Sequence, residues 1–279
     1  MSESSGGDGD ARSGTDAPDA TDAADTTHSP RDTPDSAPGT EQTRVSASAP
    51  IVVCFDMDGV LVDSEDYWHV AEREEIFSRV LDGAVPDLDE VTGMYYGEIY
   101  DYLVEHYEPT VNKGEFMRLY DEAATAIYGE RVDLLDGARE FVASLRADGV
   151  PVALVSSSPR DWIDVVLDRF DLDFDLVAPA EEFDGPGKPE PGLFEAAIAE
   201  LGGVPERAVV VEDSENGVLA AARSGARTIA VRGDHNSDTD LSAADTVVDR
   251  GDPEALYAAV GQLTRTIRES ASGNSGNWG

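Results

Sequence analysis

Short apolar runs that end abruptly in polar residues recur along the chain. The first, at residues 50–55, is rich in β-branched side chains and stops at an Asp-Met-Asp-Gly sequence. A continuous apolar run of this length is typical of a strand buried on both faces, because a half-buried strand alternates apolar and polar residues. Three further runs have the same pattern, at residues 150–155, 208–211 and 228–231. The pattern therefore predicts four buried strands.

Helical patterns separate these predicted strands. Apolar residues recur at helical spacing in four segments, at residues 139–147, 161–169, 191–201 and 215–223. Strands that alternate with helices form a parallel sheet with helices on both faces. The predicted fold class is therefore α/β, with a Rossmann-like parallel sheet as its core. In such sheets ligands bind beyond the carboxyl ends of the strands.

The segment at residues 65–131 breaks this alternation. Its apolar spacing predicts helices only, at residues 67–81, 98–106 and 113–128. Breaks are expected at residues 83–86 and at Pro109, where glycine and proline interrupt the helical pattern. We interpret this segment as a helical cap inserted into a core formed by residues 50–64 and 132–263. Because the cap is inserted directly after the polar loop of the first strand, we expect it to cover the carboxyl edge of the sheet as a lid.

Two terminal segments lack the apolar side chains that a folded core requires. Residues 1–48 consist mainly of Ser, Thr, Asp, Ala, Gly and Pro, and residues 264–279 end in a sequence rich in Ser, Gly and Asn. Segments of this composition bury too little surface to offset the entropy lost on ordering. We therefore expect a disordered acidic N-terminal tail at residues 1–48 and a C-terminal tail at residues 264–279.

Acidic residues dominate the charge, with 58 Asp and Glu against 20 Lys and Arg and a formal net charge of −38 at pH 7. This charge argues against nucleic acid and membrane surfaces as partners, because binding to either takes clustered Lys and Arg. No segment approaches the ~20 consecutive apolar residues of a membrane span. The first residues also lack the basic-then-apolar pattern of a secretion signal. We expect a cytoplasmic protein, and the sequence leaves its oligomeric state open.

Lysine is almost absent, with Lys113 and Lys188 as the only two in the chain. A large negative charge repels itself in dilute buffer, but near 1 M salt the Debye length falls to ~3 Å and the repulsion is largely screened. We interpret excess acid with depleted lysine as adaptation to a salty cytoplasm, as in a halophile; the alternative is an ordinary acidic protein of dilute cytosol. The single cysteine, Cys54, excludes an internal disulfide and a multi-cysteine zinc site.

The candidate chemistry lies in the polar residues that follow the predicted strands. Asp56 and Asp58 come after the first strand, with Gly59 allowing a sharp turn, and Asp213 follows the third. Two nearby carboxylates suggest a bound cation or a shared proton, because like charges are costly together. Magnesium typically takes one or two carboxylates, with water and substrate phosphate as its other ligands. Asp-rich turns are also common without function, so the spacing alone leaves this site a hypothesis.

Four motifs resemble the signatures of the haloacid dehalogenase superfamily of phosphatases and phosphomutases. They are Asp56-Met57-Asp58-Gly59-Val60-Leu61-Val62-Asp63-Ser64, Ser156 at the end of VALVS, Lys188 in GKPEPG, and Glu212-Asp213 in VVVEDS. The motifs follow the family's order and span nearly all of residues 51–231. The pattern is most similar to the phosphoglycolate phosphatase and β-phosphoglucomutase group, whose helical cap is inserted after the first strand.

The resemblance implies roles for the acidic residues. Asp56 would attack phosphorus and form an aspartyl-phosphate, and Asp58 would protonate the leaving alkoxide and then deprotonate the incoming water. The implied cofactor is Mg²⁺, held by the Asp56 side chain, the Asp58 backbone carbonyl and Asp213, with Glu212 helping directly or through water.

The resemblance also implies a phosphate-binding set. Ser156 and Ser157 would bind the phosphate oxygens through the hydroxyl and the following amides, and Lys188 would add a positive charge. A lysine is by default a surface residue, but its retention in a lysine-poor chain favours a function. Arg160 is a possible substrate contact, although an arginine at a helix start is more often solvated. None of the four histidines shows metal-ligand spacing.

Asp58 favours phosphate-ester chemistry within the superfamily, so the predicted function is magnesium-dependent hydrolysis of a small organic phosphate monoester. Phosphoglycolate and a sugar phosphate are both admissible substrates. The first alternative is a β-phosphoglucomutase-like sugar phosphomutase. That relative has a cap arginine in a stretch matching residues 93–96, where this sequence has no basic residue, and a cap-linker histidine where Trp68 stands. The second alternative is a non-catalytic phosphate-binding or scaffold protein, which is less favoured because every reacting group is present.

Overall fold

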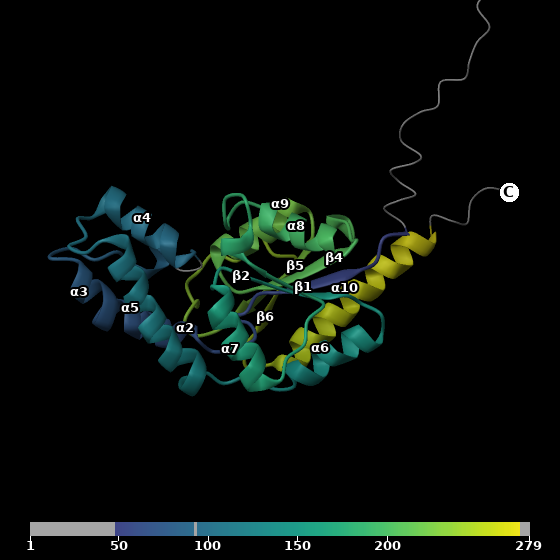
Figure 1. The fold of residues 1–279 in the computed structure, drawn as a ribbon. Helices are drawn as coiled ribbons and strands as arrows, with labels where there is room; N and C mark the ends of the chain where they lie inside the picture. Colours follow the sequence, from purple (N-terminus) through teal and green to yellow (C-terminus); the bar gives the residue numbers. More distant parts are fainter. Residues whose placement is uncertain (1–47, 92–93, 274–279) are drawn as a thin grey trace, which may run out of the picture. The chain divides into compact units, whose positions relative to one another are not determined.

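A computed structural model describes residues 48–91 and 94–273. The predicted N-terminal tail lies outside the described residues except for residue 48. The described chain contains a sheet of six parallel strands in the order β3-β2-β1-β4-β5-β6 (Figure 1). The strands are β1 (Val52–Phe55), β2 (Val152–Ser156), β3 (Leu176–Pro179), β4 (Ala208–Glu212), β5 (Arg227–Arg232) and β6 (Thr246–Asp249). The predicted α/β class with a parallel sheet is confirmed.

The four predicted strands correspond to β1, β2, β4 and β5, with their bounds shifted by a few residues. The two additional strands, β3 and β6, form the edges of the sheet and are only partly buried. The central strand β1 is fully buried and pairs with β2 on one side and with β4 on the other. Because these strands are parallel, the loops that follow them meet at one edge of the sheet.

Helices cover both faces of the sheet (Figure 1). Val53 and Phe55 face one layer, which includes α6, α7 and α10, whereas Val52 and Cys54 face the other layer, formed by α8 and α9. Burying one such apolar side chain stabilises the fold by about 1.5–3 kcal/mol. The helices of the two layers are α6 (Ala138–Ala147), α7 (Arg160–Phe170), α8 (Gly192–Glu200), α9 (Glu215–Ser224) and α10 (Pro253–Gly273).

Helix α10 corrects the predicted C-terminal boundary. The helix continues past residue 263 to Gly273, so the expectation of a tail is wrong for residues 264–273. Thr264 and Ile267 are buried at 5% and 7% exposure, because the apolar face of the helix keeps its period beyond the predicted end. Residues 274–279 lie outside the described part of the chain.

The described residues between 65 and 131 form helices and loops and contribute no strand to the sheet. Asn112 caps the last long helix by accepting a hydrogen bond from the Glu115 amide at 3.0 Å. The elements of this helical segment are α2 (Glu65–Val70), a π-helical stretch (Ala71–Phe77), α3 (Ser78–Val80), a 3₁₀ turn (Leu88–Glu90), α4 (Tyr96–His106), α5 (Lys113–Ala126) and a second π-helical stretch (Ile127–Arg131). No helix of the described residues combines the length and the apolar character needed to cross a membrane.

Candidate active site

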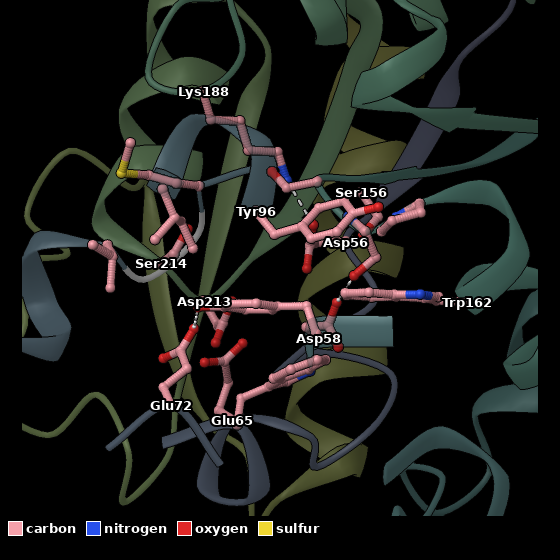
Figure 2. A pocket seen from close by; sticks show the side chains of 18 residues that line it. Asp56, Asp58, Glu65, Glu72, Tyr96, Ser156, Trp162, Lys188, Asp213 and Ser214 are labelled. Atoms are coloured by element: carbon pink, nitrogen blue, oxygen red, sulfur yellow. Dashed lines mark hydrogen bonds and ion pairs between the residues drawn. The ribbon is translucent and has the colours of Figure 1, made fainter. Parts of the chain in front are cut away.

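The floor of the site is a cluster of three carboxylates at the carboxyl ends of β1 and β4, of which Figure 2 shows Asp56 and Asp213. Asp56 follows β1, Glu212 ends β4 and Asp213 comes directly after it; one oxygen of each lies within 4.8 Å of the others. Their exposed fractions are 6%, 0% and 4%. The parallel register, in which Phe55 pairs with Val211, brings the three together.

Lys188 places a positive charge inside this cluster. Its Nζ lies 2.6 Å from Asp56 Oδ1 and 2.5 Å from Glu212 Oε1, and it donates to the Val155 carbonyl at 3.3 Å. The lysine side chain is only 2% exposed. Burial disfavours the ammonium, but the two carboxylates outweigh this effect and raise the pKa of Lys188. The lysine therefore stays charged between the two carboxylates.

The second oxygen of Glu212 is held by the start of α9. Glu212 Oε2 accepts hydrogen bonds from the Asp213 amide at 2.9 Å and from the Ser214 amide at 3.2 Å. Ser214 also caps the helix by accepting from the Gly217 amide at 3.0 Å. A Cβ atom at Gly217 would lie 2.0 Å from the Glu212 carboxylate, so only glycine allows the helix to approach this closely.

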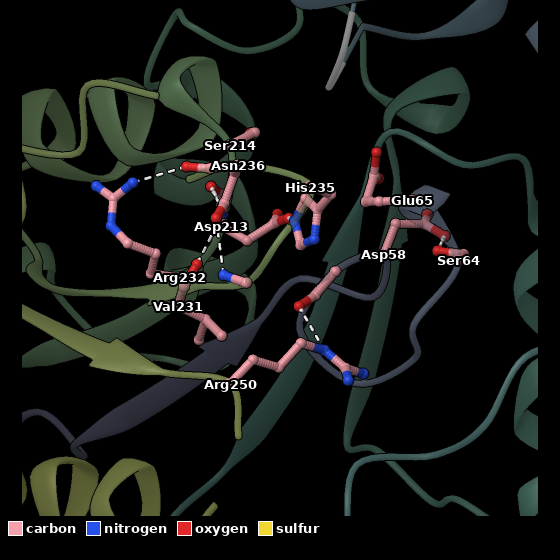
Figure 3. A network of polar contacts seen from close by, with 12 residues as sticks. Asp58, Ser64, Glu65, Asp213, Ser214, Val231, Arg232, His235, Asn236 and Arg250 are labelled. Atoms are coloured by element: carbon pink, nitrogen blue, oxygen red, sulfur yellow. Dashed lines mark hydrogen bonds and ion pairs between the residues drawn. The ribbon is translucent and has the colours of Figure 1, made fainter. Parts of the chain in front are cut away.

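The loop after β5 fixes Asp213 (Figure 3). His235 Nε2 lies 2.7 Å from Asp213 Oδ2, and Asn236 Nδ2 donates to the backbone carbonyls of Asp213 at 2.8 Å and Val231 at 2.9 Å. On the other side, Gly59 has a φ of +66°, and a Cβ atom there would lie 1.8 Å from Asp213 Oδ2. Glycine is required at this turn for two reasons: the backbone is in the left-handed region, and Asp213 leaves no space for a Cβ atom.

Asp58 lies outside the carboxylate cluster and is held by hydroxyl groups. Tyr128 donates to its Oδ1 at 2.6 Å, Ser158 donates to its Oδ2 at 2.7 Å, and Ser64 donates to its Oδ1. Tyr128 in turn accepts a hydrogen bond from Trp68 Nε1 at 2.9 Å. The network fixes the direction of the Asp58 carboxylate, which lines the same cavity as Asp56.

The loop after β2 lies against the same cavity. Ser156 and Ser157 both line it, and Ser156 Oγ accepts a hydrogen bond from the Ser158 amide at 3.0 Å. Arg160 is not brought into the lining. Its guanidinium pairs with Glu182 at 2.8 Å and donates to the Val177 carbonyl at 2.9 Å.

The helical segment at residues 65–131 supplies much of the cavity wall (Figure 2). The cavity is open to solvent, and the space inside it, open solvent included, is about 660 Å³. Beside the residues of the sheet edge, its described lining contains Glu65, Trp68, Glu72, Val91, Met94, Tyr96, Ile99, Tyr120, Pro159 and Trp162.

Electrostatically the floor has more negative than positive charge. Burial raises the pKa of Asp56 well above its usual range, although Lys188 opposes the shift. Burial also raises the pKa of Asp213 to about 6, against the opposing hydrogen bond from His235. Three carboxylates around one ammonium offer the oxygen ligands that Mg²⁺ prefers, and a divalent cation would offset the excess negative charge. Asp56, Asp213 and Glu212 therefore fit a site for a divalent metal ion.

Several residues at the site are absent from the sequence-based set. Tyr128 and Ser158 bind Asp58, and His235 binds Asp213, and neither Tyr128 nor His235 stands in a local pattern that indicates a functional role. Tyr128 lies in a helical pattern that is typical of core residues, and His235 is a lone histidine without metal-ligand spacing. The position of Ser158, within the serine run that follows β2, was the one available signal.

The parallel sheet, the carboxylates at its edge and the inserted helical segment define an α/β protein with an acidic cavity at the carboxyl edge of its sheet. The model of the haloacid dehalogenase-like hydrolase family matches residues 52–225, and the chain belongs to this family. The expected fold and the resemblance to this superfamily are thereby confirmed.

Relatives within the family agree with an enzyme of the phosphatase class. Hexitol phosphatase B of Escherichia coli (strain K12) is 33% identical over 194 residues, which cover 65% of this chain and 83% of that protein. A probable pseudouridine-5'-phosphatase of Drosophila melanogaster is 30% identical over 186 residues, covering 63% of this chain and 79% of that protein. The β-phosphoglucomutase structure from Clostridium difficile has a TM-score of 0.61 at 21% identity, covering 78% of this chain and 99% of that one, and shows the shared fold.

Proposed function

We propose that the protein is a magnesium-dependent phosphatase that hydrolyses a small organic phosphate monoester through an aspartyl-phosphate on Asp56. The observation that carries this proposal is the position of Asp56. Its carboxylate lies in a buried cluster with Glu212 and Asp213, beside Lys188, and it lines a cavity that also contains Asp58. The phosphatase names of the sequence relatives support the same reaction class.

Two displacements at phosphorus account for hydrolysis. In the first, an Asp56 oxygen forms a bond to phosphorus while the ester P–O bond breaks, and Asp58 donates a proton to the leaving alkoxide. In the second, Asp58 takes a proton from water, the water oxygen bonds to phosphorus, and the bond to Asp56 breaks to release inorganic phosphate. The hydroxyls of Tyr128, Ser64 and Ser158 keep Asp58 oriented for both steps.

Charge compensation makes the first attack possible. Mg²⁺ would be held by Asp56, Asp213, Glu212 and the Asp58 backbone carbonyl. It would supply positive charge between the Asp56 carboxylate and the phosphate, which otherwise repel each other. Lys188 adds a second positive charge, while Ser156 and Ser157 supply hydrogen-bond donors to the phosphate oxygens. Phosphoryl transfer depends mostly on such positioning and charge stabilisation.

The phosphomutase alternative is less favoured by the composition of the cavity. A mutase must hold a bisphosphate, which requires a cationic contact for the second phosphate. Within the described lining Lys188 is the only basic side chain, and it already contacts Asp56 and Glu212. Trp68 lines the cavity at the position of the mutase's histidine.

Removal of magnesium tests the proposed function. We expect the full chain to release inorganic phosphate from a generic aryl phosphate when Mg²⁺ is present, and to lose this activity in excess chelator. Activity should return when Mg²⁺ is restored, whereas Ca²⁺ should restore little, because Ca²⁺ prefers more ligands and a looser geometry. Full hydrolysis in the presence of chelator would contradict the metal requirement, and no hydrolysis of any phosphate ester would contradict the phosphatase proposal.

We also propose that the fold is adapted to high salt, on the basis of a net charge of −38 with only two lysines. The thermal unfolding temperature should rise by at least about 5 °C between 0.1 M and 2 M KCl, because salt screens repulsion among the carboxylates. Sucrose of equal osmolarity is the control and should give a smaller rise. An unfolding temperature that stays constant or falls with KCl would exclude the adaptation.

A further inference from the structure

The outer part of the cavity, above Asp56 and Asp58, has no part in the reaction steps described so far. Its described walls come from the helical segment and from Trp162 of α7. We call this outer part the chamber. A monoester whose phosphorus faces Asp56 would place its leaving group in the chamber. The residues of the chamber therefore determine which leaving group fits.

Four aromatic rings form one wall of the chamber. Trp68 stacks on Tyr120 and on Trp162, with ring centroids 5.5 Å and 5.2 Å apart. Tyr96 contacts the same two rings, at 5.7 Å from Tyr120 and 5.0 Å from Trp162. Each ring thus packs against two others in a closed cycle. The four rings pack against one another and form a rigid wall. This arrangement differs from an aromatic cage, in which ring faces stay open to bind a quaternary ammonium.

Two carboxyl groups point into the same chamber (Figure 2). Glu72, in the π-helical stretch, is 7% exposed and accepts a hydrogen bond from Tyr120 Oη at 2.9 Å. The Glu65 side chain, at the start of α2, is 13% exposed. Burial raises the pKa of Glu72 to about 7 and, with Asp213 and Asp58 adding to the effect, raises the pKa of Glu65 well above its usual range. A neutral carboxyl offers both a donor and an acceptor, which is the pair that hydroxyl groups match.

Positive charge is scarce in the chamber. Lys188 is the only basic side chain of the described lining, and its two partners are at the floor. Residues 92 and 93, between two lining residues, are Thr and Gly in the sequence and add no charge. His69 Nε2 lies 3.9 Å from Glu65 Oε2 but is not among the described lining residues. An anionic leaving group would therefore face Glu65 and Glu72 with no basic side chain of the described lining to pair with except the already paired Lys188, which is costly in a buried site.

We propose that the chamber selects phosphate monoesters whose leaving group is a neutral polyol or sugar, with Glu72 and Glu65 binding its hydroxyls. It rejects esters whose leaving group carries a carboxylate or a second phosphate. This inference rests on the proposed phosphatase function, and it separates the two substrates that the sequence leaves open, a sugar phosphate and phosphoglycolate.

A matched set of substrates tests the selectivity of the full chain with Mg²⁺ in high salt. We expect kcat/KM for glucitol 6-phosphate to exceed that for phosphoglycolate and for fructose 1,6-bisphosphate by at least about 100-fold. Equal or better hydrolysis of phosphoglycolate or of the bisphosphate would overturn the inference. Hydrolysis of an aryl phosphate in the same assay shows that the phosphatase proposal itself holds.

Variants of the two carboxyl groups test their role. Glu72→Leu should lower kcat/KM for glucitol 6-phosphate by at least about tenfold relative to an aryl phosphate, because a leucine side chain offers a hydroxyl neither a donor nor an acceptor. Glu65→Leu should shift the ratio in the same direction, so that misfolding of one variant leaves the other informative. The control is Glu74→Leu, which changes an exposed carboxylate of the same π-helical stretch and should leave the ratio unaltered. An unchanged ratio in both folded test variants would refute the role of these carboxyl groups.

Discussion

Asp56→Asn should lower kcat by at least about 10⁴-fold, because an amide cannot form the bond to phosphorus on which both displacements depend. The fold should persist. Lys188 keeps Glu212 as a partner at 2.5 Å, and an amide oxygen at position 56 can accept the hydrogen bond that Asp56 Oδ1 accepts from Lys188. Two measurements check the prediction: turnover of an aryl phosphate with Mg²⁺, and the thermal unfolding temperature of the variant.

The matched control for this prediction is Asp66→Asn, which changes an exposed carboxylate on α2 a few residues along the chain. It should retain the parental turnover. A fluoride complex of beryllium, which mimics a phosphoryl group, should bind to the parent at Asp56 and fail to bind to Asp56→Asn. If the folded Asp56→Asn protein still turns over substrate at the parental rate, the nucleophile is another group.

Lys188→Met should affect both stability and activity. The substitution leaves Asp56 and Glu212 buried without their shared cation, and breaking a buried ion pair in this way costs about 3–5 kcal/mol. For a domain of this size, such a loss lowers the unfolding temperature by roughly 10 °C. Turnover should fall by at least about 10²-fold, because the phosphate loses a charge that stabilises its transition state.

The chain contains its own control for this experiment. Lys113 is the second of the two lysines and forms an exposed pair with Asp101 at 2.7 Å, with the two side chains 42% and 67% exposed. Lys113→Met should change stability by less than about 1 kcal/mol and leave turnover intact. Thermal unfolding and aryl phosphate turnover of the two variants, measured side by side, check both expectations. Equal effects of the two substitutions would show that burial of Lys188 has no energetic consequence.

Sequence patterns predicted the parts of the fold in which one face or both faces of an element are uniformly apolar. The strands β1, β2, β4 and β5 were predicted because their buried residues form continuous apolar runs. The edge strands β3 and β6 were missed, since their short apolar runs are flanked by acidic residues and only partly buried. The end of α10 was missed because most residues there are polar, so the two buried residues, Thr264 and Ile267, form no clear apolar pattern.

The candidate site was predictable where the loops directly follow strands. Asp56, Ser156 and Asp213 meet at one edge because parallel strands end there together. Contacts between distant segments have no local pattern in the sequence. Tyr128 and Asp58 are 70 positions apart, and only the folded chain shows their hydrogen bond. Arg160 was only a possible substrate contact, because an arginine at a helix start is more often solvated, and its guanidinium pairs with Glu182.

The hydrogen bond between Trp68 and Tyr128 joins the two connections of the inserted helical segment to the core. Trp68 lies close to the segment's beginning, Tyr128 close to its end, and Arg169 of α7 donates to the Tyr128 carbonyl at 2.9 Å. Asp58 accepts a hydrogen bond from Tyr128 at this junction. The proposed proton donor is therefore oriented at the point where the helical segment joins the core. Glu65 and Glu72 flank Trp68 in the sequence, so a substitution that breaks the junction should disturb the orientation of the proton donor and the choice of leaving group together.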